Sequence, residues 1–133
     1  RSAETGNDLR TRGGRRVRMS GGGDPELGER DQRSRSAARG RYGRNAMVQG
    51  AAAEFFKTWA VIVRARLPVG AHIVLCLHDE LLVHVPTSGA AEVATIVDEA
   101  LQETAVRWAQ PELRGDVRFT ADTSVIARWS DAK

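Results

Sequence analysis

Apolar residues recur every three or four positions in two separate stretches of the chain. The first stretch covers residues 47–67, and Pro68 and Gly70 then supply the signals that end a helix. The second covers residues 90–108, where acidic residues occupy the opposite face. This spacing predicts two amphipathic helices, and the chain is compatible with helix from about Ala37 onward. The apolar positions of the first helix are Val48, Ala52, Phe55, Trp59, Ile62 and Val63.

Between these helices, two short and almost continuously apolar runs meet at His78, Asp79 and Glu80. This pattern predicts a β-hairpin over residues 72–85, with the polar tripeptide at its tip. Strands this apolar are typical of strands that are buried on both faces. We therefore expect the tip to project from the core into a cleft, and we expect Cys76 to be a small core residue.

The two ends of the chain carry weaker patterns. Residues 8–19 are typical of a short β-ribbon that turns at Gly13 and Gly14, whereas residues 20–36 have too little apolar surface to order themselves and are predicted to form a flexible loop. Near the C-terminus, apolar and polar residues alternate over residues 117–122, as in a half-buried strand. Together these elements predict an α+β fold, in which an antiparallel sheet of the hairpin and the C-terminal strand is covered by two main helices.

Size and composition limit the class of protein. A chain of 133 residues with 41% hydrophobic residues is long enough for one small domain. Because Cys76 is the single cysteine, no disulfide can form within the chain, and we expect a cytoplasmic location. The apolar stretches are shorter than the roughly 20 residues that span a bilayer, and no signal-peptide pattern opens the sequence, so we expect no membrane partner.

Charge is distributed unevenly along the chain. Residues 1–46 carry twelve arginines against six acidic residues, whereas residues 47–133 carry eight basic and eleven acidic residues. Arginine is the side chain best suited to bidentate contacts with phosphate, so this excess suggests a polyanionic partner. An arginine-rich composition inherited from a GC-rich genome explains the same numbers equally well.

Asp79 and Glu80 are the first candidates for chemistry. Two adjacent carboxylates on the tight turn of a rigid hairpin are suited to a hard divalent cation such as Mg²⁺. The alternative is that they are only the polar tip of a turn. His72, His78 and His84 recur six residues apart, but a hairpin would separate His78 from the other two, so a three-histidine zinc centre is not favoured.

A second set of candidates lies on the first helix. Arg41, Asn45 and Gln49 are four residues apart, which places them on one helix face. Arginine, asparagine and glutamine are the side chains that reach base edges and sugars in nucleic acids. A solvated helix face is the alternative. The small residues 50–53 that follow would let another backbone or a duplex approach closely.

The two sets together resemble the C-terminal palm portion of family A (Pol I-type) DNA polymerases. Arg41-x3-Asn45-x3-Gln49-Gly50 is similar to a helix of that family, and Leu77-His-Asp-Glu80 is similar to its motif C hairpin. The resemblance extends upstream to the Leu-Arg-Thr-x-x-Gly-Arg pattern at residues 9–15. It extends downstream to residues 129–133, and so covers nearly the whole chain except residues 20–35.

The resemblance implies a function and a set of roles. The family adds nucleotides to a primer 3′-hydroxyl with two Mg²⁺ ions, in DNA replication and repair. Asp79 would bind these ions, Glu80 would be an auxiliary carboxylate, and His78 would lie near the primer terminus. The minor-groove side of the primer-template would be lined by Arg41, Asn45 and Gln49. The partners implied are primer-template DNA and deoxynucleoside triphosphates, for a monomeric, nucleoid-associated parent protein.

Two parts of the family pattern have no match in this sequence. These are the Asp-Tyr-Ser type motif A, which carries the other metal-binding aspartate, and the Arg-x3-Lys-x6-Tyr fingers helix, which handles the incoming nucleotide. We therefore expect an Arg-rich ribbon and loop over residues 1–36, a palm portion over residues 37–133, and no polymerisation by the isolated chain. The alternatives are a non-catalytic DNA-binding remnant and a small metal-dependent hydrolase built on the hairpin tip.

Overall fold

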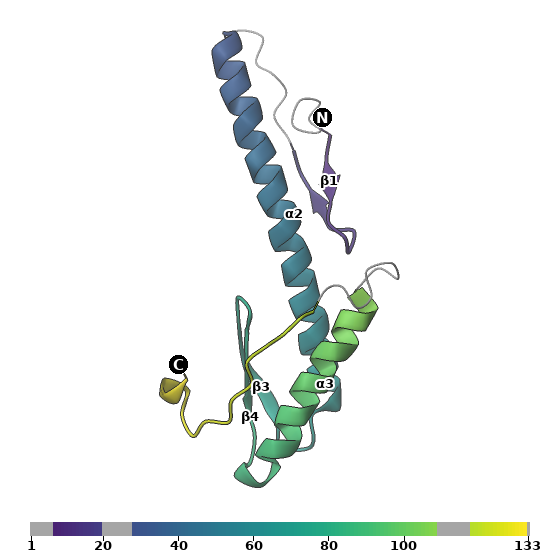
Figure 1. Ribbon diagram of the computed structural model, residues 1–133, viewed down its shortest axis with the longest axis vertical. Helices are drawn as coiled ribbons and strands as arrows, with labels where there is room; N and C mark the ends of the chain where they lie inside the picture. The colour runs from purple at the N-terminus through teal and green to yellow at the C-terminus, as the bar shows by residue number, and fades with distance from the viewer. Residues whose placement is uncertain (1–6, 20–27, 109–117, 133) are drawn as a thin grey trace. The chain divides into compact units, whose positions relative to one another are not determined.

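The computed structural model describes residues 7–19, 28–108 and 118–132. In chain order, the elements are β1 (Leu9–Arg10), β2 (Arg16–Val17), α2 (Glu29–Arg66), β3 (His72–Leu77), β4 (Glu80–His84), the 3-10 helix η1 (Thr87–Gly89), α3 (Ala90–Trp108) and the 3-10 helix η3 (Trp129–Asp131) (Figure 1). The chain divides into two compact units, Arg1–Glu54 and Phe55–Lys133, and the boundary falls within α2. None of the described helices is both long and apolar enough to cross a membrane.

The first unit contains the predicted β-ribbon, which the structure confirms. Strands β1 and β2 pair antiparallel, with Leu9 opposite Val17. Gly14 in the turn has a φ of +89°, a left-handed conformation that glycine adopts without steric cost. The buried residues of the ribbon are Thr11, Val17 and Met19.

Two glycines of α2 allow the ribbon to lie close to the helix. Gly43 and Gly50 are seven residues apart and therefore share a helix face. A Cβ atom on Gly43 would lie 2.8 Å from Met19 Cε, and a Cβ atom on Gly50 would lie 2.5 Å from Thr11 Cγ2. Because carbon atoms do not normally approach this closely, larger residues at these two positions would displace the ribbon.

The predicted flexible loop over residues 20–36 is wrong for its second half. Helix α2 begins at Glu29, eighteen residues before the predicted helix of 47–67. Residues 20–27 lie outside the described residues. The prediction relied on low apolar content, which excludes a buried face but does not exclude a solvated helix. Oppositely charged pairs four residues apart, such as Asp31 and Arg35, favour such a helix.

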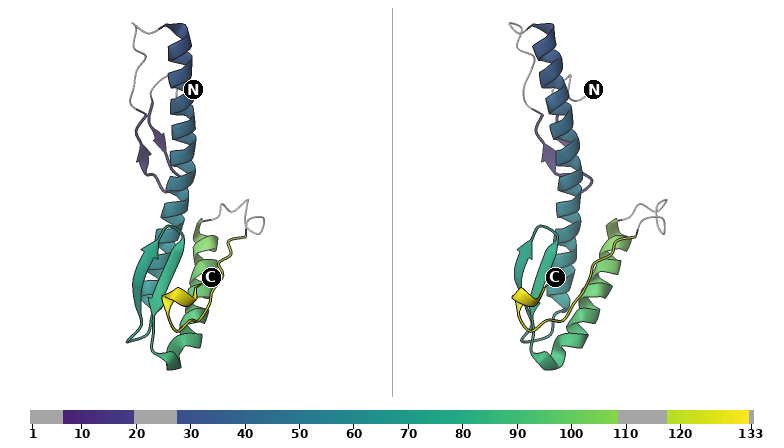
Figure 2. Two further views of the ribbon diagram at one scale, coloured as in Figure 1. Left: turned by 90° about the vertical axis from the view of Figure 1, so that its left-hand side faces the viewer. Right: turned by 60° about the vertical axis from the view of Figure 1, so that its left-hand side comes forward.

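The second unit is built around a small core. Its buried residues are Trp59 and Val63 from the last turns of α2, and Ala100 and Leu101 from α3. The Trp59 Nε1–H donates a hydrogen bond of 3.0 Å to the carbonyl oxygen of Val97, which links the two helices. In Figure 2, the β3–β4 hairpin and α3 lie on either side of this end of α2. The predicted helix over residues 90–108 is confirmed without a shift of its bounds.

The hairpin is confirmed, but its burial differs from the prediction. Strands β3 and β4 pair antiparallel, with His72 opposite His84 and Leu77 opposite Glu80, and the register shifts between Ile73 and Leu75. One face packs on the core through half-buried residues. The other face is exposed at Val74 and Leu77, and Cys76 is also exposed, so two-sided burial and a core position for Cys76 are both wrong. An apolar run indicates what a strand can bury, whereas coverage depends on which elements pack against it.

The C-terminal segment lacks the predicted strand over its described residues. Residues 118–128 carry no strand assignment, and residue 117 lies outside the described part. The half-buried Phe119 stacks on Phe55 with ring centroids 4.2 Å apart, and the Thr123 hydroxyl donates to the Asp98 carboxylate at 2.6 Å. The segment is therefore held by side chains and not by a strand ladder. The predicted α+β class is confirmed, with two separate two-stranded sheets.

Candidate metal and nucleic-acid site

The hairpin tip presents three polar side chains to solvent. His78 and Asp79 form a two-residue turn, Glu80 begins β4, and all three residues are exposed. His78 has a φ of 52°, in the left-handed region, where histidine occurs more often than most residues but less readily than glycine. The turn therefore keeps the Asp79 carboxylate out of the interior, as metal binding would require.

The donor set at the tip suits a hard cation but is incomplete. Carboxylate oxygens are the ligands that Mg²⁺ prefers, and it binds six of them or of water molecules in octahedral geometry. Within residues 7–19, 28–108 and 118–132, no group of three or more His, Cys, Asp or Glu side chains is placed to hold a metal ion. Asp79 and Glu80 can therefore supply only part of a metal site.

The three histidines of the hairpin do not converge. His72 is paired with His84 at one end of the ladder, whereas His78 lies in the turn at the other end. Five residues of strand separate His78 from the pair, or about 16 Å at the rise of a β-strand. A zinc centre with all three histidines is therefore excluded by the register.

The predicted DNA-binding residues lie on an exposed helix face. Arg41, Asn45 and Gln49 are all exposed and occupy successive turns of α2. The small run that follows does permit close approach of another backbone, as predicted, because Gly50 lies under Thr11 of the ribbon. These residues belong to the first unit, whereas the hairpin tip belongs to the second.

A hydrogen-bonded cluster that the sequence did not reveal connects the ribbon turn to α2. The Thr11 hydroxyl donates to Glu54 Oε1 at 2.6 Å, and the Gly13 N–H donates to Glu54 Oε2 at 3.0 Å. The Thr11 hydroxyl oxygen also accepts the Arg15 N–H at 3.0 Å. The hydrogen bond from Thr11, followed by those from the backbone of Gly13 and Arg15, holds the pKa of Glu54 below its ordinary value of 4.5. Because Thr11 and Glu54 are 43 residues apart, no local pattern could have indicated this contact.

The comparison with known families gives the identification. The sequence model of DNA polymerase family A matches residues 2–131, which is nearly the whole chain. The chain belongs to DNA polymerase family A. Members of this family generally use divalent metal ions, which agrees with the chemistry of the hairpin tip. The α+β fold is consistent with part of a polymerase domain.

Individual relatives agree with the family assignment. The chain is 36% identical over 110 residues to the thermostable DNA polymerase I of Thermus filiformis, covering 82% of this chain and 12% of that protein. It is 41% identical over 80 residues to that of Thermus caldophilus, covering 59% and 10%. It is 32% identical over 90 residues to DNA polymerase theta of Caenorhabditis elegans, covering 67% and 5%. No solved structure gives a significant match. The family A chain therefore spans about an eighth or less of these relatives' lengths.

Proposed function

We propose that this family A chain is the C-terminal palm portion of a template-directed DNA polymerase that transfers nucleotides to a primer 3′-hydroxyl. The observation that carries the proposal is the family match over residues 2–131. It is supported by the exposed His-Asp-Glu tip of the hairpin, which resembles the motif C of that family. We also propose that the parent protein acts as a cytoplasmic, nucleoid-associated monomer in replication and repair.

The hairpin tip would contribute the metal-binding half of the chemistry. Asp79 would be the principal ligand of Mg²⁺, and Glu80 would add a second carboxylate nearby. A bound magnesium pair supplies activation of the primer hydroxyl and stabilisation of the leaving pyrophosphate. His78 would lie beside the primer terminus, where its exposed imidazole can contact the backbone of the last nucleotide. The rigid ladder behind the turn would fix the direction of these groups.

The exposed face of α2 would hold the primer-template. Arg41 would contact phosphate or sugar oxygens, while the side-chain amides of Asn45 and Gln49 would hydrogen-bond to base edges on the minor-groove side. Deoxynucleoside triphosphates would be bound by parts of the family pattern that this sequence does not contain. For that reason, the 133-residue chain by itself is proposed to be inactive in primer extension.

The decisive experiment is a chimera with a relative. The segment of the Thermus filiformis polymerase that matches this chain is replaced by this chain, and primer extension is measured with Mg²⁺. We expect extension by the chimera, loss of at least about a hundredfold in Asp79→Ala, and little change in Asp122→Ala, which removes an exposed aspartate that is not part of the tip tripeptide. A chimera that folds and binds primer-template but does not extend it would contradict the proposal.

The alternative of a non-catalytic DNA-binding remnant has one observation in its favour. The described residues hold no complete metal-ligand cluster, while residues 1–46 carry a net excess of arginine. Both functions predict salt-sensitive DNA binding, so binding alone does not separate them. An inactive chimera with normal DNA affinity would favour the remnant. Metal-dependent nuclease activity that disappears in Asp79→Ala would instead favour a small hydrolase.

A further inference from the structure

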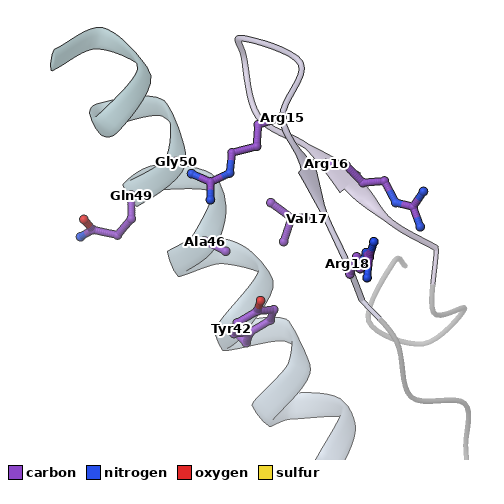
Figure 3. A pocket seen from close by; sticks show the side chains of 8 residues that line it. All are labelled: Arg15, Arg16, Val17, Arg18, Tyr42, Ala46, Gln49 and Gly50. Atoms are coloured by element: carbon purple, nitrogen blue, oxygen red, sulfur yellow. The ribbon is translucent and has the colours of Figure 1, made fainter. Parts of the chain in front are cut away.

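The first unit contains a cavity between the ribbon and α2 that none of the roles above uses. Its volume is about 450 Å³, within the range of pockets that bind small molecules or groups. The lining side chains include Arg15, Arg16 and Arg18 from the ribbon, and Tyr42 from the helix (Figure 3). No carboxylate is among the lining residues, although the Glu54 carboxylate lies within electrostatic range of Arg15. Because three arginines line the cavity, positive charge remains in excess there and the cavity is suited to an anion.

Arg15 is the arginine that is aimed at the helix. In Figure 3, its side chain extends from the ribbon turn to the side of α2 near Gly50, whereas the Arg16 side chain points away from the helix. Arg16 is already engaged, because its Nε lies 2.5 Å from the Asp8 carboxylate. Tyr42 also lines the cavity, so its hydroxyl adds a neutral donor there.

The backbone of Arg15 is held from both sides. Its N–H donates to the Thr11 hydroxyl oxygen at 3.0 Å, and its carbonyl oxygen accepts the Thr11 N–H at 2.9 Å. Glu54 fixes Thr11 on α2, and Gly50 lies directly beneath the Thr11 methyl group. A guanidinium on a backbone fixed in this way loses less conformational freedom when it binds a ligand.

We propose that this cavity binds one phosphodiester group of the nucleic-acid backbone. Arg15 contacts two phosphate oxygens with its planar fork, and the Tyr42 hydroxyl donates to the same group. Glu54 and Thr11 are positioning residues that hold Arg15 in place. In Figure 3, the Gln49 amide points away from the ribbon, so it remains available to the minor-groove face. The inference rests on the proposed function, because it requires that α2 faces DNA.

The first test compares two arginines of the same ribbon. The affinity of the 133-residue chain for a primer-template duplex is measured by fluorescence anisotropy from about 50 to 200 mM salt. Arg15→Gln is expected to weaken binding about tenfold and to reduce the salt slope by about one. Arg12→Gln removes the same charge from an exposed turn residue that does not line the cavity, and is expected to change both quantities much less. Equal effects of the two variants would indicate diffuse charge and overturn the site.

The second test asks whether a substitution of Glu54 strengthens or weakens DNA binding. Removing a carboxylate near DNA should strengthen binding if only net charge matters. If Glu54 positions Arg15, then Glu54→Gln and Thr11→Val should weaken binding, whereas Thr11→Ser should restore it because serine keeps the hydroxyl. Glu54→Gln should also add little to Arg15→Gln in the double variant. Tighter binding by Glu54→Gln would contradict the positioning role, and circular dichroism of each variant checks the fold.

Two further outcomes separate this inference from the proposed function. If millimolar pyrophosphate abolishes the difference between wild type and Arg15→Gln, the cavity takes a free anion and the backbone assignment is wrong. If Gln49→Ala weakens binding but Arg15→Gln does not, the cavity fails while the DNA-binding face stands. If the wild-type chain shows no salt-sensitive DNA binding, the proposed function and the cavity fail together.

Discussion

Replacing Gly50 by alanine is the sharpest test of how the ribbon is held on α2. The new Cβ atom would lie 2.5 Å from Thr11 Cγ2, and the next nearest atom, Thr11 Cβ, is 3.7 Å away. Carbon atoms pack best at about 3.5–4.0 Å, so the ribbon must move by about 1 Å. Overpacking of this kind costs about 1–3 kcal/mol, whereas alanine in a helix interior gains about 1 kcal/mol over glycine. Ribbon docking is therefore expected to weaken by about 1–3 kcal/mol, while the net stability of the first unit falls by about 0–2 kcal/mol.

A second substitution isolates the one methyl group responsible. Thr11→Ser removes Cγ2 but retains the hydroxyl that donates to Glu54. Alone, it should cost about 1 kcal/mol for the lost buried methyl group. Combined with Gly50→Ala, it leaves the new Cβ at an ordinary 3.7 Å from Thr11 Cβ, so the double variant should be as stable as wild type within about 1 kcal/mol.

The measurement must report on the ribbon and not only on the second unit. Hydrogen exchange of the Thr11 amide is suitable, because this N–H is bonded to the Arg15 carbonyl oxygen at 2.9 Å. Faster exchange in Gly50→Ala and recovery in the double variant are expected. Unchanged exchange in Gly50→Ala, or no coupling between the two substitutions, would refute close packing of Thr11 on Gly50.

Three other predictions concern separate parts of the chain. Trp59→Phe leaves the carbonyl of Val97 without its 3.0 Å hydrogen bond, so urea unfolding should show a loss of about 1–3 kcal/mol in the second unit. Because the pKa of Glu54 is lowered from 4.5 in the folded chain, the ionised carboxylate stabilises ribbon docking fully above pH 4.5. This stabilisation is lost as the pH falls through the lowered pKa. The NMR shift of the Gly13 amide should report the loss, and Glu54→Gln should abolish the transition. His78→Gly relieves the left-handed φ of 52°, so the hairpin should become more stable by about 1 kcal/mol. The rate of primer extension by the chimera should fall, and an unchanged rate would show that His78 is not part of the site.

Whether an element could be predicted from the sequence depends on how far apart in the chain its interacting residues lie. The helix over residues 90–108 and the hairpin were predictable because one period of apolar residues, with stop signals, occurs within each segment. The start of α2 was missed because a solvated, charged helix has no apolar period to detect. The C-terminal strand was missed because alternation, here marked by Phe119, does not provide a pairing edge.

The candidate site shows the same division. The candidates at 41, 45, 49 and 78–80 were proposed from spacing and residue type, and their roles stay predictions. The hairpin register places His78 and Asp79 in the turn and Glu80 at the start of β4, so the tip lies where the pattern predicted it. The contact of Glu54 with Thr11 and the aim of Arg15 into a cavity were not identifiable, because these depend on which helix face the ribbon covers.

By itself, the sequence determined most of the elements in this family A chain, the hairpin tip that carries Asp79 and Glu80, and the helix face that carries Arg41. Local periodicity and turn chemistry act between near neighbours, so they can be read along the chain. Only the tertiary structure decided that the outer face of the hairpin and Cys76 are exposed, that the ribbon packs on Gly50, and that Glu54 holds Thr11. These outcomes require packing between segments about 40 residues apart, and such packing follows from shape and satisfied hydrogen bonds that no local pattern encodes.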